Sequence, residues 1–339
     1  MKKLTKRFVL GTANLADNYG INNSNIIKNS SFKKIFLFLK KNRIFFIDTA
    51  YSYKNAEKNL SKFNLKNFEI ISKLPVLQSR KNMDKNILKI ISKKNKSKII
   101  CLTAYSKNIA SIIDKHCDII LVGDSLGSVL YNFSTTKKVS MNMMIEHSKS
   151  VRMGVKKSLM VVDMPYNTYR NPKEALKNAR KIISITKCDA VKLEGGKKIY
   201  PIVETLIKNK IQVMGHLGLL PQSAKNFKFK GKKLIERKNI LRDSKLLEQV
   251  GVFSIVLECI ESSLAKEITK TINIPTIGIG ASSHCDGQVL VTDDLIGLNK
   301  IGARFVKKYS NITKQINDAV LKFKQDVTKG KFPSKKHSY

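Results

Sequence analysis

Tryptophan is absent from this chain of 339 residues, and cysteine, proline and acidic residues are all scarce. The five cysteines are odd in number and form no Cys-x-x-Cys pair, so neither a disulfide framework nor a zinc site of the usual spacing is expected. No apolar run reaches the roughly 18 to 20 residues that span a bilayer, and the basic N-terminus lacks the apolar core of a signal peptide. These absences predict a cytoplasmic protein with reduced thiols and no membrane partner.

A large positive charge accompanies the shortage of acidic residues. The chain has 64 Lys and Arg residues against 25 Asp and Glu, which gives a formal net charge of +39. A nucleic acid or an anionic membrane is a common partner of so basic a protein. However, the lysines are spread along the whole chain, and no zinc-finger, helix-turn-helix or RNP-type pattern accompanies them. Codon drift in an AT-rich genome, which favours Lys, Asn and Ile, explains the same composition, so we do not expect a nucleic-acid partner.

Short apolar runs alternate with longer amphipathic segments from residue 98 onward. Most of the runs are nearly continuous in Val, Ile, Leu and Met, as is typical of parallel strands buried on both faces. Eight such strands in this length match a (β/α)8 TIM barrel, although a doubly wound open sheet would show the same pattern. The expected strands are Lys98–Tyr105, Asp118–Ser125, Ser158–Pro165, Ala190–Gly196, Gln212–Gly218, Ser254–Ile260, Pro275–Ala281 and Gly287–Asp294.

Residues 1–82 have too few elements to close a barrel by themselves. We interpret them as a partial, barrel-like β/α segment, followed by the barrel in residues 83–339, with the boundary near Met83. A Lys- and Asn-rich stretch, residues 76–97, joins the two parts. The expected elements here are strands at Phe8–Gly11, Ile44–Ala50 and Phe68–Leu74, and helices at Phe32–Lys41 and Lys85–Lys93.

Polar or ionisable residues stand at the C-terminal ends of five successive expected strands. Barrel enzymes gather their catalytic residues at that end of the strands. One polar residue there is ordinary, because an Asp or Ser often caps the helix that follows. Five strands in succession indicate an active site. The residues are Asp124 with Ser125, Asp163, Lys192 with Glu194, His216, and Glu258.

The residue types indicate what this site does. The carboxylates of Asp124, Asp163 and Glu194 are hard oxygen ligands of the kind that Mg²⁺ prefers. Lys192 lies two residues before Glu194, so both side chains point to the same face of the strand. A buried lysine there would offset a substrate carboxylate or a developing enolate. A Schiff base and a structural ion pair with Glu194 remain open alternatives.

A glutamate and a histidine also stand at strand ends. A glutamate at the end of an apolar strand, such as Glu258, is costly unless it has a partner or a task. We therefore interpret Glu258 as a general base. A lone histidine at a strand end, such as His216, is as often structural as catalytic.

Seven segments together carry a family resemblance. They resemble, in order and nearly in spacing, the signature segments of ketopantoate hydroxymethyltransferases, from about residue 83 to the end of the chain. The segments are Leu102–Tyr105, Val122–Gly127, Asp163–Pro165, Val191–Gly196, Gly215–Ser223, Leu257–Cys259 and Ile277–Ala281.

The resemblance implies an activity and a set of roles. Members transfer a hydroxymethyl group from 5,10-methylenetetrahydrofolate to 3-methyl-2-oxobutanoate, forming 2-dehydropantoate through a magnesium-stabilised enolate. It also implies a homo-oligomer, as a ring of dimers. By motif matching, magnesium would lie at Asp124 and Asp163, with Glu194 in its coordination environment; the keto-acid would contact Asp124, Ser125, Asp163, Lys192 and His216; and Glu258 would accept the proton.

Residues 1–80 resemble the opening third of an aldo-keto reductase. Asp48, Tyr53 and Lys73 match that family's catalytic residues, but the nucleotide-binding half does not follow. We therefore expect no reductase activity, and an in-frame fusion or a true start codon nearer Met83 explains the segment. The matching segments are Leu10–Ala13, Phe46–Tyr53 and Ile71–Pro75.

Two other functions fit parts of the sequence. A metal-dependent lyase of the phosphoenolpyruvate-mutase type would share the barrel and the acidic cluster. A decayed barrel that binds nucleic acid would explain the charge, and salt-sensitive DNA binding without turnover would identify it. The intact acidic cluster argues against decay.

Overall fold

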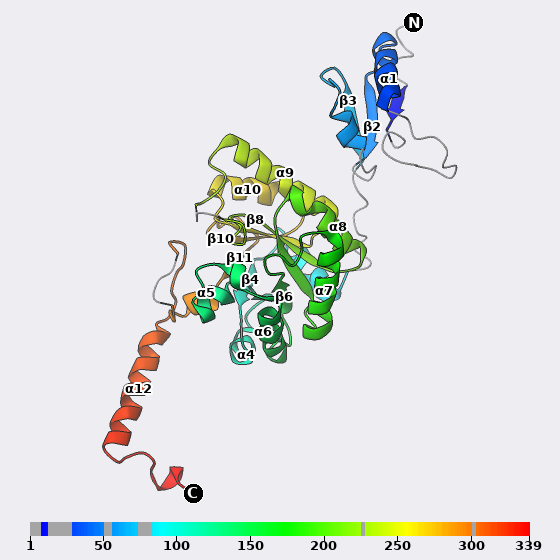
Figure 1. Cartoon of the computed structure of the whole chain (residues 1–339). Helices are drawn as coiled ribbons and strands as arrows, with labels where there is room; N and C mark the ends of the chain where they lie inside the picture. The colour runs from blue at the N-terminus through cyan, green and yellow to red at the C-terminus, as the bar shows by residue number, and fades with distance from the viewer. Residues whose placement is uncertain (1–7, 13–28, 51–55, 74–82, 225–227, 300–302) are drawn as a thin grey trace. The chain divides into compact units, whose positions relative to one another are not determined.

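A computed structural model of the chain describes residues 8–12, 29–50, 56–73, 83–224, 228–299 and 303–339. The chain divides into two compact units, Met1–Leu77 and Gln78–Tyr339 (Figure 1). The division falls close to the boundary expected near Met83. Within the described residues, no helix is both long enough and apolar enough to cross a membrane.

The first unit is a small parallel sheet packed against helices. Its strands, β1 (Val9–Gly11), β2 (Phe46–Ala50) and β3 (Glu69–Lys73), form near the three segments expected from the sequence, and they lie in the order β1-β2-β3. A small core forms against helices α1 (Asn29–Lys41) and α2 (Ala56–Leu60). The sheet does not close on itself, because three strands are too few for a barrel. The core residues are Phe32, Phe36, Leu39, Ile47, Leu60 and Phe68.

The residues that resemble a reductase are only partly described in this unit. Asp48 lies in β2 and Lys73 is the last residue of β3. Tyr53 lies outside the described residues. The described part of this unit thus contains the strands that resemble those of the reductase. The absence of reductase activity remains a prediction.

The second unit contains a closed barrel of eight parallel strands, in the order β10-β11-β4-β5-β6-β7-β8-β9. The eight strands expected from the apolar runs are confirmed. The alternative of an open, doubly wound sheet is wrong, because β11 pairs with β4 and closes the ring. The strands are β4 (Ile99–Thr103), β5 (Ile119–Val122), β6 (Leu159–Asp163), β7 (Ala190–Glu194), β8 (Val213–Gly218), β9 (Ser254–Glu258), β10 (Thr276–Ile279) and β11 (Gly287–Leu290).

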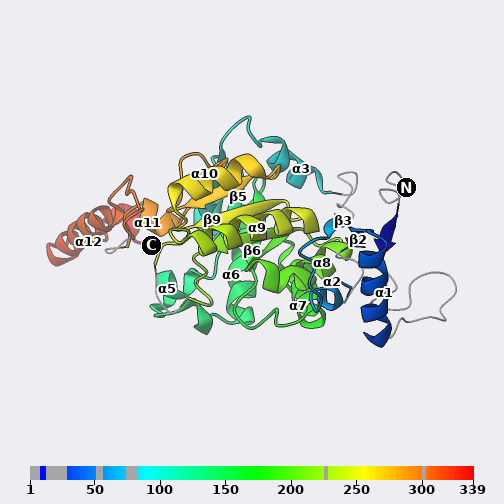
Figure 2. The ribbon, with the colours of Figure 1, turned by 90° about the horizontal axis from the view of Figure 1, so that it is seen from above.

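Helices surround most of this barrel (Figure 2). Their boundaries follow local capping signals: in α7, for example, the Asn171 side chain accepts a hydrogen bond from the Glu174 backbone N–H, and Pro172 occupies the first turn. The short connection from β10 to β11, residues 280–286, contains no helix. These helices are α4 (Lys107–Ile113), α5 (Leu126–Tyr131), α6 (Met141–Gly154), α7 (Pro172–Thr186), α8 (Tyr200–Lys208), α9 (Leu234–Val250), α10 (Ser262–Thr271) and α11 (Thr292–Leu295). A further helix, α12 (Ile312–Thr328), has no buried residue.

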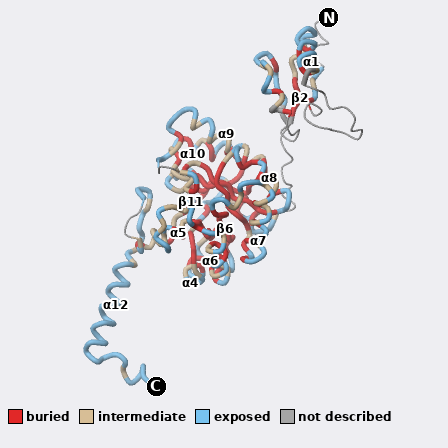
Figure 3. Tube along the Cα trace, viewed as in Figure 1, coloured by how far each residue is buried: buried red, intermediate tan, exposed pale blue. Residues whose placement is uncertain are grey.

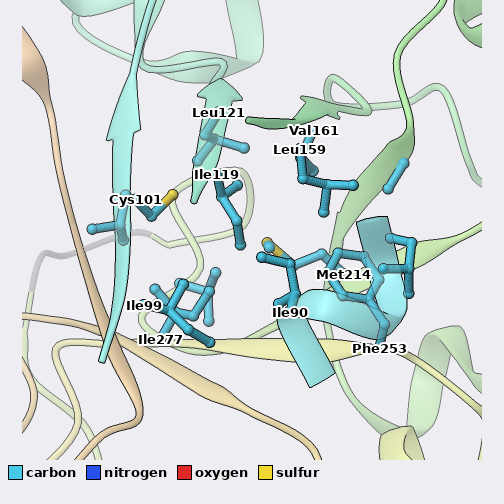
Figure 4. Packing of buried hydrophobic residues seen from close by; sticks show 14 of the residues in the cluster. Ile90, Ile99, Cys101, Ile119, Leu121, Leu159, Val161, Met214, Phe253 and Ile277 are labelled. Atoms are coloured by element: carbon cyan, nitrogen blue, oxygen red, sulfur yellow. The ribbon is translucent and has the colours of Figure 1, made fainter. Parts of the chain in front are cut away.

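The barrel is filled by apolar side chains from its strands (Figure 4). Helix α3 (Lys85–Ser92) adds Ile87, Ile90 and Ile91 to this cluster, and Met83 packs against it. The tube in Figure 3 accordingly shows the strands as buried, whereas α12 is exposed. Because the interior is packed, the polar residues are left at the C-terminal ends of the strands.

Candidate active site

The structure brings all seven predicted site residues together. They line one cavity of about 230 Å³ at the C-terminal ends of β5 to β9. This volume is below the roughly 300–1,000 Å³ of pockets for drug-sized ligands, so the cavity suits a small substrate. The seven residues are Asp124, Ser125, Asp163, Lys192, Glu194, His216 and Glu258.

Two buried aspartates lie next to each other in this cavity. Asp163 is the last residue of β6, and Asp124 follows β5 by two residues. The Asp124 backbone N–H donates to Oδ2 of Asp163 at 3.1 Å. Burial, and next the negative charge of Asp163, raise the pKa of Asp124 to about 7. These two effects outweigh the positive charge of Lys192, which lowers the pKa of Asp124.

Lys192 forms an ion pair across the sheet. Its Nζ lies 2.7 Å from Oδ1 of Asp163, and both side chains are buried. The two residues face each other in the register of β6 and β7. The structural ion pair that the sequence left open, between Lys192 and Glu194, is therefore wrong. Neighbouring strands are about 4.8 Å apart, whereas residues i and i+2 of one strand are about 6.5 Å apart, which favours the cross-strand partner.

The lysine is also held in its charged form. Burial lowers the pKa of Lys192, but the carboxylates of Asp163, Glu194 and Asp124 outweigh it and raise the pKa above its usual range. A Schiff-base lysine needs the opposite, a neutral amine. The charge favours the binding of an anionic substrate over the Schiff-base alternative.

His216 lies between two glutamates. Its Nε2 is 3.2 Å from Oε2 of Glu258, and its Nδ1 is 3.6 Å from Oε1 of Glu194. Burial and the charge of Lys192 lower the pKa of the ring, but the two carboxylates outweigh them and raise it to about 9. The same contact lowers the pKa of Glu194, against the effect of burial. The raised pKa favours the protonated, imidazolium form of the ring.

A glycine allows the strand of His216 to approach that of Glu258. Gly218 has a φ of +99°, and a Cβ on it would lie 2.2 Å from the backbone oxygen of Glu258. The next residue, Leu219, donates its N–H to that oxygen at 2.8 Å. Only glycine tolerates this left-handed conformation and close approach without strain. The turn thereby fixes the end of β9, where Glu258 is placed.

The donor set fits a divalent cation that keeps part of its water shell. Within the described parts of the chain, no group of three or more His, Cys, Asp and Glu residues is arranged to hold a metal ion. Mg²⁺ is commonly held by one or two carboxylates together with waters and substrate oxygens. Asp124 and Asp163 match this pattern. Glu194 faces His216. We therefore place it beside the two aspartates, in the surroundings of the cation.

Three residues that form hydrogen bonds around the site residues had no role in the sequence interpretation. The hydroxyl of Tyr105 lies 2.8 Å from Oγ of Ser125 and holds that side chain. Gln222 donates to Asp124, and Tyr169 donates to Gln222. Tyr105 and Gln222 stand in two of the family-like segments, which was their only signal in the sequence.

Comparisons with known proteins match this unit. The family model described as ketopantoate hydroxymethyltransferase matches residues 84–335. A 3-methyl-2-oxobutanoate hydroxymethyltransferase of Pelagibacter ubique (strain HTCC1062) is 81% identical over 257 residues, which cover 76% of this chain and 100% of that protein. A protein of the same name from Anaplasma marginale (strain St. Maries) is 46% identical over 257 residues, 75% of this chain and 93% of that protein.

Solved structures support the barrel. A 2,3-dimethylmalate lyase, a member of the PEP mutase/isocitrate lyase superfamily, matches with a TM-score of 0.51. The match covers 74% of this chain and 87% of that one, at 10% sequence identity. At this identity the likeness concerns the fold alone.

Proposed function

The chain belongs to the ketopantoate hydroxymethyltransferase family, and we propose that its cavity transfers a hydroxymethyl group from 5,10-methylenetetrahydrofolate to 3-methyl-2-oxobutanoate with magnesium as cofactor. The observation that carries the proposal is the gathering of all seven motif residues in one small cavity. Family membership favours this transfer over the lyase alternative.

The binding roles follow from charge and position. Asp124 and Asp163 would hold the magnesium ion, with Glu194 beside them. Lys192, buried and charged, would bind the carboxylate of the keto-acid, with a hydrogen bond from Ser125. A bound magnesium ion would act as a Lewis acid that favours negative charge on the keto oxygen.

Glu258 would begin the reaction as a general base. Its carboxylate takes the proton from C3 of the keto-acid, and the electrons of that C–H bond form the C2–C3 double bond of an enolate. C3 of the enolate then attacks the methylene carbon of 5,10-methylenetetrahydrofolate. Both bonds from this carbon to the folate nitrogens break, water supplies the hydroxyl oxygen of the new hydroxymethyl group, and tetrahydrofolate leaves. The imidazolium of His216, 3.2 Å from Oε2, orients the carboxylate. Lys192 places a second positive charge in the cavity where negative charge develops.

A turnover assay with and without magnesium tests this function. We expect formation of 2-dehydropantoate from the keto-acid and 5,10-methylenetetrahydrofolate, and its loss when magnesium is chelated. Cleavage of a keto-acid without use of the one-carbon donor would identify a lyase. Salt-sensitive DNA binding without any turnover would instead support the nucleic-acid alternative.

We also propose that the enzyme works in the cytoplasm. All five cysteines are free thiols, and three of them are buried. Free thiols are typical of a reducing compartment.

The first unit is not required for this chemistry in our proposal. All proposed site residues lie in the second unit, and the family model begins at residue 84. Helix α3 starts with a complete cap, because the Asp84 side chain accepts a hydrogen bond from the Asn86 N–H. A chain that begins at Met83 retains this cap and the contact of Met83 with the core.

We therefore expect a shortened chain, residues 83–339, to fold and to keep hydroxymethyl transfer. Circular dichroism on heating and the turnover assay measure the two properties. A chain that begins at Ser97 is the control: it loses Ile87, Ile90 and Ile91 from the core, and burial of each contributes about 1.5–3 kcal/mol. A soluble, correctly assembled 83–339 chain without activity would contradict the proposed domain boundary.

A homo-oligomer would cover the apolar face of α12. Ile316, Val320, Phe323 and Val327 recur at helical spacing and are all exposed. The barrel has a groove of about 1180 Å³ whose lining includes the apolar residues Ile99, Phe229 and Phe305. Ile100 of β4 also lines this groove and is 46% exposed. We propose that α12 of a second copy occupies this groove, since an exposed apolar stripe commonly marks an interface.

A charge placed on this face should weaken assembly. Phe323→Glu is expected to lower the oligomer mass measured by light scattering after gel filtration, because a carboxylate would be buried without a partner. Gln325→Glu adds the same charge on the opposite face of α12 and should leave the mass unchanged. If both variants keep the parent mass, α12 does not contribute to assembly.

A further inference from the structure

Gln222 contacts the ends of three successive strands. Its Nε2 donates to Oδ2 of Asp124 at 2.8 Å and to the backbone oxygen of Met164 at 3.0 Å. Its backbone N–H donates to Oε2 of Glu194 at 3.1 Å. The side chain is almost fully buried, with 3% of the residue exposed. One residue, from the turn after β8, thus connects the loops that carry the carboxylates of β5, β6 and β7.

The orientation of the Gln222 amide is fixed by its partners. The Met164 carbonyl and the Asp124 carboxylate accept hydrogen bonds, so they require the NH2 group. The hydroxyl of Tyr169 donates to Oε1 on the other side. Burial, and next the charge of Glu194, raise the pKa of Tyr169 above its usual range, so its hydroxyl stays a donor. Each polar group of the amide therefore has a partner, and a flipped amide would lose the hydrogen bonds to Asp124 and Met164.

The Gln222 side chain constrains the Asp124 carboxylate from outside the cavity. Gln222 does not line the cavity that holds the seven site residues; it lines an adjacent pocket with Tyr169 and Glu194. Its hydrogen bond uses Oδ2 of Asp124, a residue that lines the cavity. A carboxylate that is held by one oxygen keeps the other in a defined position, which is how outer hydrogen bonds orient metal ligands.

We infer that Gln222, itself held by Tyr169, is a positioning residue that orients the Asp124 carboxylate for magnesium. The inference rests on the proposed magnesium-dependent function. In this inference Gln222 does not contact the substrate, so Gln222 affects turnover through the metal ion. The effect should therefore appear in magnesium affinity and in the magnesium concentration that turnover requires.

The test is a magnesium titration of the Gln222→Met variant of the whole chain. Methionine keeps the length of the side chain but cannot donate a hydrogen bond. Calorimetry should show that the magnesium Kd rises by about 10–100-fold, the usual cost of losing such an outer partner. Turnover at limiting magnesium should fall in the same proportion and largely recover at saturating magnesium. A merely structural defect would lower turnover at every magnesium concentration.

Two further variants complete the design. Gln212→Met replaces another buried glutamine, just before β8 and away from the C-terminal strand ends, and should leave the Kd unchanged. Tyr169→Phe removes only the hydroxyl that fixes the amide, so it should raise the Kd in the same direction by less. The Tyr169→Phe variant tests the same inference if Gln222→Met does not fold.

The outcomes separate this inference from the proposed function. If the parent enzyme binds magnesium but Gln222→Met and Tyr169→Phe keep its Kd, the inference is wrong and the function stands. If the parent enzyme neither binds nor needs magnesium, the inference about Gln222 and the proposed function are both wrong. A Kd raised in both variants but not in Gln212→Met supports the positioning role.

Discussion

Replacement of Glu258 by glutamine is expected to lower turnover by roughly 10²–10⁴-fold while the protein still folds. Glutamine has nearly the same shape, and the side chain of Glu258 is partly exposed, at 17%, so the packing of β9 should not change. An amide cannot take the C3 proton of the keto-acid. It also carries no charge to attract the imidazolium of His216. The variant therefore separates proton transfer from structure.

Hydrogen exchange measures this step directly. The parent enzyme should exchange the C3 hydrogen of 3-methyl-2-oxobutanoate with deuterated water, even without the folate. Glu258→Gln should abolish that exchange, whereas Glu146→Gln, at an exposed ion pair with Lys149, should not alter it. Exchange by Glu258→Gln at the parent rate would mean that another residue is the base.

Replacement of Asp163 by asparagine is expected to abolish magnesium binding and also to destabilise the fold. The variant loses a hard anionic ligand. It also leaves the charge of Lys192 without its nearest partner in a buried site, since both side chains of this pair are at most 6% exposed. Breaking a buried ion pair from one side costs about 3–5 kcal/mol. Asp124 and Glu194 offset part of this cost.

A double variant separates the two effects. Asp163→Asn combined with Lys192→Met removes both charges, so chemical unfolding should show that stability recovers while calorimetry still detects no magnesium binding. Loss of binding in the single variant alone, with recovery in the double variant, would indicate an indirect effect of misfolding. Parent-like magnesium affinity in both variants would contradict the metal site at Asp163.

The sequence predicted the barrel and the composition of the site for a local reason. Each buried parallel strand is a short apolar run, and each run can be identified without knowledge of its neighbours. The direction of a strand also shows which of its ends carries the chemistry. Asp124, Asp163 and Glu258 were therefore found from the sequence alone, and the inward direction of Lys192 and Glu194 followed from side-chain alternation.

The contacts between site residues depended on the tertiary structure. Lys192 meets Asp163, and Glu194 meets His216, because these residues are partners in the registers of β6 with β7 and of β7 with β8. Register is set by the packing of the whole barrel, so no local pattern specifies it.

Closure of the ring likewise depends on residues far apart in the chain. It requires β11 to pair with β4, some 190 residues earlier in the sequence. The role of Gln222 has the same origin, because its amide reaches Asp124 across 98 positions of sequence. The sequence by itself thus determined which side chains stand at the C-terminal ends of the strands, and the folded barrel decided which of them touch.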